Sequence, residues 1–175
     1  MKKLTSIFLL LILMLSVTSC VLNSSDNYTP SEDYDSCLPP RSSVKKYVYD
    51  YVGELTKEEN DCLVAQMKAL DDFNGSQIVI IITDELCGYS ITDYSVKVFN
   101  EWGIGQRDIN NGLMIVCSPA MHECRITTGY GTEKVLPDEK CLEIGNKSFG
   151  NGKDEIYLKL NDALSYIVPI MRASF

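Results

Sequence analysis

Residues 103–133, GIGQRDINNGLMIVCSPAMHECRITTGYGTE, decide the fold of this chain. The stretch begins as a polar loop with two glycines, becomes an apolar run at Leu113, turns at SPAMHE and returns through CRITTG to a second loop with two glycines. A short apolar run bounded by turn residues predicts a buried strand over 112–117, and the return predicts an antiparallel strand over 124–128. The loops 103–111 and 129–133 are then expected to meet at one edge of the sheet.

The segments before this hairpin predict a parallel sheet with helices on both faces. QIVIIITD, residues 77–84, is apolar on both faces and predicts a central strand. A helix over 91–102, capped by SITD, connects it to the strand at 112, so a right-handed crossover joins two parallel strands. Thr56 and Glu59 form a capping box for a helix that ends near Asn74, after a short edge strand over 47–51.

Two further helices are expected after the hairpin, over 138–149 and 154–171, and Pro169 is expected to fray or kink the second. The fold class is therefore α/β, a three-layer α/β/α sandwich on a small mixed β-sheet.

Size and charge limit the classes of partner. The chain has 175 residues, 45% hydrophobic and 23% charged, as in an ordinary globular protein, and a net charge of −8. Loss of an N-terminal segment containing Lys2 and Lys3 would make this −10. Such a charge disfavours nucleic acid and anionic lipid as partners. It is compatible with a divalent cation or a basic partner, and equally with a role in solubility alone.

The N-terminus has the layout of a secretory signal peptide over residues 1–19: a basic start, an apolar run and small residues. VTSC, Val17 to Cys20, resembles the bacterial lipobox, which implies that Cys20 carries fatty acyl chains such as palmitate and anchors the chain stably in a membrane. The alternative is ordinary cleavage near Ser19, with Cys20 left as a free thiol. Residues 20–43 are polar and proline-containing and are expected to be a flexible tether, with the folded domain over 44–175. The expected location is the bacterial cell envelope, periplasmic or facing the surface.

Six cysteines remain besides Cys20, and an even number in an exported chain permits disulfide bonds. Six cysteines allow 15 pairings, among which the sequence does not choose. Cys117 and Cys124 flank the turn of the hairpin, so a cross-strand bond between them is one candidate.

Four motifs in order, VYDYVGELTKEE, SITDYSVKVFNEWGIG, NNGLMIVC and ITTGYGTE, resemble the TPM domain family from about Val48 to the C-terminus. The resemblance implies a compact α/β/α fold. It implies function only loosely, because plant members are described as acid phosphatases with divalent-metal sites whereas other members are non-enzymatic accessory subunits. This chain departs from the family in its cysteine content. Its segment FGNGKDEIY stands where relatives have a more basic stretch, and it lacks the glycine-rich or transmembrane tail that many bacterial relatives carry.

The two glycine-containing loops are the first candidate site. They bring oxygen donors together, and carboxylate and amide oxygens suit Ca2+ or Mg2+; the candidate ligands are Asp108, Asn111, Glu133 and Asp138. The backbone amides of Gly129 to Gly131 could instead bind an anion, or the loops could be turns that need positive φ, with solvated carboxylates.

Two acidic residues make a second candidate site at the opposite edge. Asp50 corresponds to the acidic position that the resemblance places before the first helix, and Asp84 follows the first central strand. A turn or capping role for them is the alternative.

The resulting functional hypothesis is a membrane-tethered, non-catalytic accessory module. It would bind a protein partner of the envelope and a divalent cation. The alternative is a weak metal-dependent acid phosphatase. Catalysis is disfavoured because His122 is the single histidine and no nucleophile has an adjacent base.

Overall fold

A computed structural model of the chain describes residues 37–150 and 155–175. The signal peptide, Cys20 and most of the expected tether lie outside these residues. In the described part, no helix has both the length and the apolar character needed to cross a membrane.

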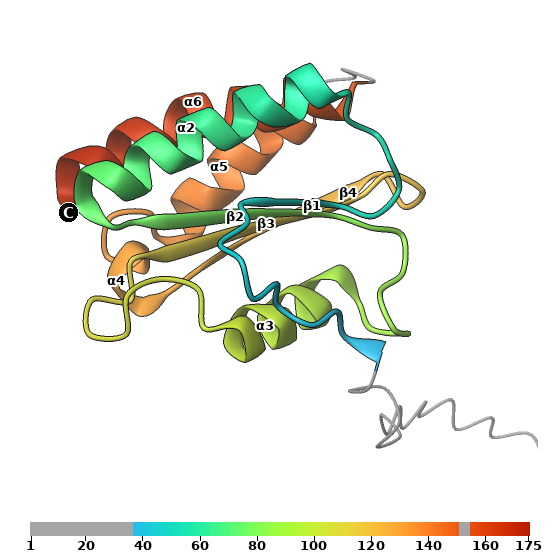
Figure 1. The fold of residues 1–175 in the computed structure, drawn as a ribbon, viewed down its shortest axis with the longest axis horizontal. Helices are drawn as coiled ribbons and strands as arrows, with labels where there is room; N and C mark the ends of the chain where they lie inside the picture. The colour runs from blue at the N-terminus through green and yellow to red at the C-terminus, as the bar shows by residue number, and fades with distance from the viewer. Residues whose placement is uncertain (1–36, 151–154) are drawn as a thin grey trace, which may run out of the picture. The chain divides into compact units, whose positions relative to one another are not determined.

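One mixed sheet of four strands in the order β1-β2-β3-β4 forms the centre of the domain (Figure 1). The strands are β1 (Val48–Asp50), β2 (Gln77–Ile82), β3 (Gly112–Ser118) and β4 (Glu123–Thr128). The first three are parallel, and β4 is antiparallel to β3, with Ile115 opposite Ile126. The expected parallel pair β2–β3, the antiparallel hairpin β3–β4 and the edge position of β1 are confirmed. The carboxyl ends of β1, β2 and β3 therefore share one edge of the sheet, called here the carboxyl edge, and their amino ends share the amino edge.

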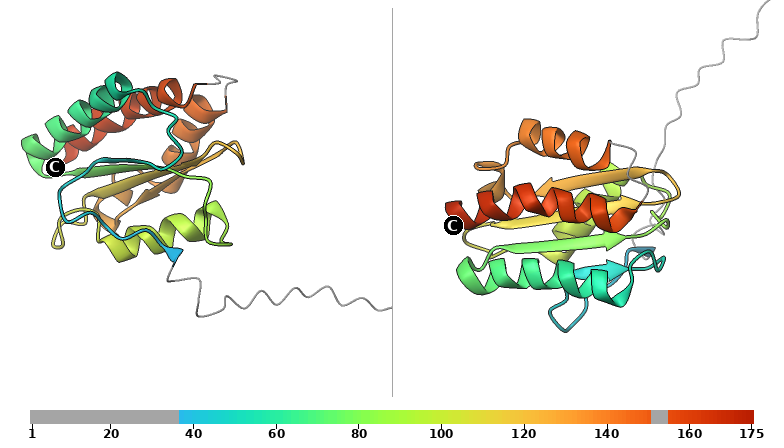
Figure 2. Two further views of the ribbon diagram at one scale, coloured as in Figure 1. Left: turned by 45° about the vertical axis from the view of Figure 1, so that its right-hand side comes forward. Right: turned by 90° about the horizontal axis from the view of Figure 1, so that it is seen from above.

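Helices cover both faces of the sheet, which confirms the three-layer α/β/α sandwich (Figures 1 and 2). On one face lie α2 (Lys57–Asn74), α5 (Asp138–Phe149) and α6 (Ile156–Ser174), and on the other lies α3 (Ile91–Trp102). Alternate residues of the central strands serve the two layers: Ile80 and Ile115 pack in the first, and Ile81 and Val116 in the second. All four are fully buried, which explains why β2 and β3 have no polar face.

Local signals fix most helix ends. Thr56 and Glu59 form the expected capping box of α2, and Gly75 ends the helix with φ 74°. Ser90 caps α3 by accepting from the amide of Asp93. The helix α6 continues past Pro169 to Ser174, although it was expected to end near Met171. Pro169 is exposed, so the carbonyl group that its missing N–H leaves free can reach water.

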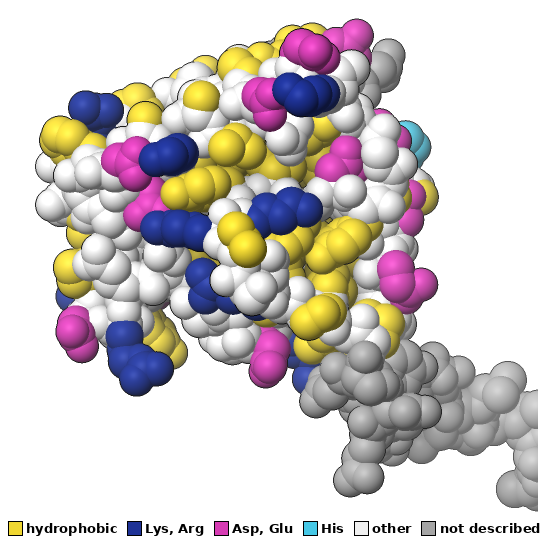
Figure 3. Space-filling view, in the orientation of Figure 1, with side chains coloured by type: hydrophobic (Ala, Val, Ile, Leu, Met, Phe, Trp, Pro, Cys, Tyr) yellow, Lys and Arg dark blue, Asp and Glu magenta, His cyan; other side chains and the backbone are white. Residues whose placement is uncertain are grey.

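The β1 edge of the sheet is short and positively charged. Lys45 and Lys46 are exposed and precede the strand, and each lies over the ring of a tyrosine, Tyr47 and Tyr49 respectively. Figure 3 shows Lys and Arg side chains gathered among hydrophobic ones across the middle of this face. Short length and flanking lysines are features that protect an edge strand from pairing with another chain.

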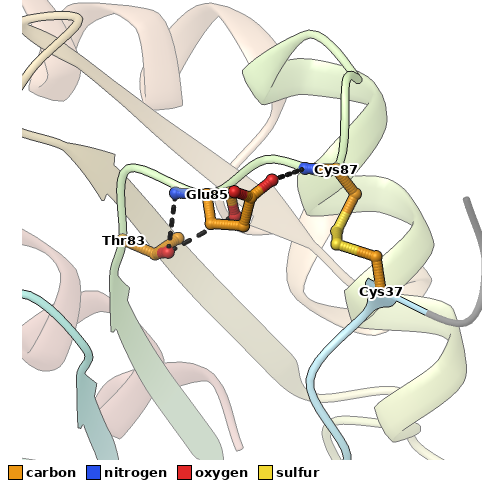
Figure 4. The surroundings of a disulfide bond; sticks show 4 residues. All are labelled: Cys37, Thr83, Glu85 and Cys87. Carbon is orange, nitrogen blue, oxygen red and sulfur yellow. Dashed lines mark hydrogen bonds between the residues drawn. A yellow bond between two sulfur atoms is a disulfide. The ribbon is translucent and has the colours of Figure 1, made fainter.

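Residues 37–43 belong to the folded domain, in contrast to their expected place in the tether. Cys37 is disulfide-bonded to Cys87 in the loop after β2 (Figure 4). Beyond it, the carbonyl of Pro39 accepts a hydrogen bond from Nε1 of Trp102 at 2.8 Å, and Arg41 donates to the Trp102 carbonyl. The segment thus satisfies the polar groups of a buried tryptophan at the end of α3, a contact that its polar composition does not reveal.

Candidate functional site at the amino edge

The two glycine-containing loops meet at the amino edge, as the hairpin topology predicts. The amide of Gly129 donates to the carbonyl of Gly112 at 2.9 Å. The carbonyl of Asn110 accepts from the amides of Gly131 and Thr132 at 3.1 and 3.3 Å. A four-residue helix, α4 (Tyr130–Glu133), forms where a loop was expected. The loops are therefore joined through their backbones.

Close approach of the two backbones explains the glycines. A Cβ atom on Gly131 would lie 2.0 Å from the carbonyl oxygen of Ile109, and one on Gly112 would lie 2.1 Å from that of Ile104. The expectation of positive φ at Gly112, Gly129 and Gly131 is wrong, since none of them has it. The left-handed residues of this site lie in the loop 103–111, where Gly103, Gly105 and Asn110 have φ values of 55°, 102° and 56°. Gly131 is needed because a side chain there would separate the two loops, and Gly112 is needed because a side chain would collide with the start of its own loop at Ile104.

Asn111, one of the four predicted metal ligands, points into the protein. Its side chain is fully buried, its Oδ1 accepts from the amide of Gln106 at 2.9 Å, and its Nδ2 donates to Oγ of Ser76 at 3.4 Å. Asn111 therefore holds the loop to the start of β2 and offers no free oxygen to an ion at the surface.

The remaining predicted ligands, Asp108, Glu133 and Asp138, are exposed. Their carboxylates do not come together as a group of three: among the described residues, the one such group of metal-binding side chains is Cys37, Glu85 and Cys87. Both sulfur atoms of that group are committed to a disulfide bond (Figure 4). The four residues thus do not form one coordination sphere in this conformation, and binding of Ca2+ or Mg2+ stays a prediction.

The alternative anion site at Gly129 to Gly131 loses two of its three donors to the protein itself. The amides of Gly129 and Gly131 are both used in the contacts between the loops. A phosphate that bound to these two amides would have to break those hydrogen bonds.

At the carboxyl edge, Asp50 and Asp84 have structural roles. The Asp50 carboxylate accepts from the amides of Val52, Gly53 and Leu55 at 3.2, 2.8 and 2.9 Å, which shapes the turn before α2. Oδ1 of Asp84 accepts from Oγ of Ser118 at 3.0 Å and from the amide of Ala120 at 2.9 Å. These contacts agree with the alternative prediction of a turn role. Both residues lie at the edge opposite Asp108, as the sequence predicted.

Two disulfide bonds hold the carboxyl edge. The predicted Cys117–Cys124 bond joins β3 to β4, and Cys37–Cys87 is a pairing that the sequence left open. Of the other cysteines in the described part, Cys62 is exposed and Cys141 is buried, and burial raises the pKa of the Cys141 thiol to about 11.

Sequence reasoning missed a cleft beside the joined loops. It has a volume of about 420 Å3 and lies between α3, the loop 103–111 and the end of β4. Its lining includes Phe99, Arg107 and Tyr130, and the Tyr130 side chain is 80% exposed. Val96 also lines it and is 43% exposed. The signal that could have found it is the aromatic residue between two glycines, Gly129-Tyr130-Gly131.

These features define a small α/β/α domain with a rigid, backbone-joined edge and an aromatic cleft beside it. A family model of the TPM domain matches residues 48–155, so the chain belongs to the TPM domain family. No curated protein matches the sequence closely enough to count as a relative.

Three solved bacterial structures share the fold. The N-terminal domain of a P. gingivalis protein has a TM-score of 0.65 and 22% identity, covering 73% of this chain and 82% of that one. The protein BA42 of Bizionia argentinensis has a TM-score of 0.59 and 18% identity, with 71% and 86% coverage. The N-terminal domain of the cg2496 protein of Corynebacterium glutamicum has a TM-score of 0.57 and 16% identity, with 79% and 86% coverage. At these identities the similarity concerns the fold alone.

Proposed function

We propose that this chain is a membrane-tethered TPM module that binds a protein partner of the cell envelope through the cleft at the amino edge and does not catalyse a reaction. The observation that carries the proposal is the exposed Tyr130, which lines that cleft together with Arg107. Tyrosine and arginine are the residue types most enriched at the energetic centres of protein interfaces. The rigid backbone behind Tyr130 lowers the entropy lost when a partner binds.

The place where the chain enters the domain supports this arrangement. Cys37, where the described chain begins, is bonded to Cys87 in the loop after β2, at the carboxyl edge. The cleft is lined by residues 103–107 and 127–130, and these segments lie at the amino edge (Figure 1). If Cys20 carries lipid, residues 21–36 reach at most ~55 Å from the membrane when fully extended. The chain would then enter the domain at one edge and present the cleft at the other, where an envelope protein can approach it.

A photocrosslinking amino acid in place of Tyr130 tests the partner, with the same amino acid in place of Tyr51 as the control. Tyr51 is also an exposed tyrosine, 51% accessible, but it follows β1 at the carboxyl edge. We expect irradiated cells to give one discrete crosslinked envelope protein from position 130 and none from position 51. The same product from both positions, or none from 130, contradicts the proposed surface.

Hydrolysis of an aryl phosphate, with and without Ca2+ or Mg2+, tests the absence of catalysis. We expect no metal-dependent turnover by the purified full-length chain. Turnover that disappears in Asp108→Ala would show that the phosphatase alternative is correct.

A further inference from the structure

We infer that the free edge of β4 binds an extended, lysine- or arginine-containing segment of a partner protein as an additional strand of the sheet. This inference rests on the binding role proposed above and specifies the chemistry of the partner and its mode of binding.

The hydrogen-bond pattern of the hairpin shows which groups of β4 face outward. Gly112 and Gly129 are opposite each other, and the Gly129 amide donates to the Gly112 carbonyl. Hydrogen-bonded and non-hydrogen-bonded pairs alternate along an antiparallel ladder. Cys124, Ile126 and Thr128 are therefore in non-hydrogen-bonded pairs with β3, and their N–H and C=O groups point away from it. The Cα–Cα distance of 4.1 Å between Cys117 and Cys124 agrees with this assignment.

These outward groups have no backbone partner among residues 37–150 and 155–175. Three residues thus offer six backbone groups along one edge, which is the arrangement that strand addition requires. The β1 edge differs, since it has three residues and two preceding lysines, whereas β4 has six residues and neither lysine nor proline.

Two helices form walls on either side of this edge. A cavity of about 600 Å3 lies between α5, the start of α3 and residues 122–126 of the hairpin. The amino-edge cleft continues along the strand, since it is lined by residues 127–130 and by the second half of α3. Figure 2 shows α5 at the β4 side of the sheet and α2 at the β1 side. The β4 backbone therefore lines both hollows in succession, and the two together, which end at Tyr130, are called here the channel.

The walls select a single extended segment. A second copy of this chain that paired edge to edge would bring its own α3 and α5 against these helices, whereas one strand needs only the width of the channel. Neighbouring strands lie about 4.8 Å apart, so an added strand occupies the space directly beside β4.

The charges that line the wider part of the channel favour a basic segment. Glu123, Asp138 and Glu139 supply three exposed carboxylates, and Arg125 is the one arginine or lysine in that lining. The net charge of −8 adds a long-range attraction for the same partners. Main-chain pairing would supply affinity, and these carboxylates would select for lysine or arginine.

A peptide of defined sequence tests the mode of binding. The probe is a blocked heptapeptide, Thr-Lys-Val-Lys-Val-Lys-Thr, with two controls: the same peptide with glutamate in place of lysine, and the lysine peptide with all backbone nitrogens methylated. We expect the full-length chain in 0.15 M salt to bind the first peptide at least tenfold more tightly than either control. Equal binding of the methylated peptide would overturn the inference, because strand pairing needs those N–H groups.

Amide hydrogen exchange by NMR locates the peptide on the chain. We expect slower exchange at Cys124, Ile126 and Thr128 when the peptide is bound. Arg125 and Thr127 should change little, because their amides are already in hydrogen-bonded pairs with β3. Protection without this alternation, or protection centred on another element, would overturn the inference.

Charge-reversal variants give a matched pair. Glu139 and Glu58 are both exposed acidic residues in the first turn of a helix, α5 and α2 respectively, so reversal disturbs both helix dipoles alike. We expect Glu139→Lys to weaken the lysine peptide about fivefold, the effect of losing and reversing an exposed ion pair, and Glu58→Lys to leave it within twofold. Equal weakening by both would show that attraction is only to the net charge.

The two proposals fail separately. A crosslinked partner at position 130 without peptide binding leaves the accessory role and overturns strand addition. Peptide protection along β4 without a crosslinked envelope protein supports the channel and overturns the proposed partner at the cleft.

Discussion

The substitution Gly131→Ala measures how closely the two loops of the amino edge approach. The new Cβ would lie 2.0 Å from the Ile109 carbonyl oxygen and 3.0 Å from that of Asn110. Normal contact needs more than 3 Å, so the loops must separate by about 1 Å, which breaks the hydrogen bonds from Gly131 and Thr132 to Asn110. With each bond worth about 1 kcal/mol and added strain, we expect a loss of about 2–4 kcal/mol of unfolding free energy.

Gly145→Ala is the matched control. Gly145 lies inside α5, and a Cβ there would meet one atom of Phe149 at 4.0 Å, which is ordinary contact. We expect this variant to gain about 0.5–1 kcal/mol because alanine favours the helix. Thermal unfolding followed by circular dichroism should therefore show a Tm about 10 °C lower for Gly131→Ala and slightly higher for Gly145→Ala. A Gly131→Ala protein as stable as the unsubstituted chain would refute the backbone contact.

Two further substitutions and one labelling reaction test other parts of the domain. Asn111→Ala should lower the unfolding free energy measured in urea by about 1–3 kcal/mol, because it leaves buried partners unpaired. The control Asn100→Ala, at an exposed position, should change it by no more than about 0.5 kcal/mol. Similar losses in both variants would contradict the buried role of Asn111. Asp50→Ala removes the acceptor of three amides, so it should lower the free energy of unfolding by about 1–3 kcal/mol in the same assay. An unchanged free energy of unfolding would contradict the role of Asp50 in the turn. At pH 8, iodoacetamide should modify exposed Cys62 while Cys141, with its pKa raised to about 11 by burial, reacts only after denaturation; modification of Cys141 in the folded chain, seen by peptide mass, would contradict its burial.

Much of the fold follows from local rules. The capping box at Thr56, the glycine after α2 and the apolar runs of β2 and β3 each act within a few residues, and each element formed where its signal stands. The hairpin order then determined which loops meet. Such features are predictable because the physical cause lies in the same stretch of sequence as its effect.

The candidate site was less predictable because its causes lie far apart in the chain. Asn111 was predicted as a surface ligand, but its side chain is buried: Nδ2 donates to Ser76, 35 residues away, and Oδ1 accepts from the amide of Gln106. The partner of Cys87 lies 50 residues before it in a segment of tether-like composition. Gly131 was correctly identified as important, but the reason is the backbone of the other loop, at Ile109, and not its own φ.

The edges of the sheet are stabilised by different contacts, and this separates stability from the binding of a strand at β4. Backbone contacts close the amino edge, and disulfide bonds and Asp50 and Asp84 hold the turns of the carboxyl edge. Changes there should alter the free energy of unfolding. The β4 edge keeps outward backbone groups and a wall of carboxylates that are exposed, so changes on that wall should alter affinity for a strand with little effect on stability. If Gly131→Ala changes only the free energy of unfolding, and Glu139→Lys changes only the affinity for the lysine peptide, the scaffold and the recognition surface are physically distinct.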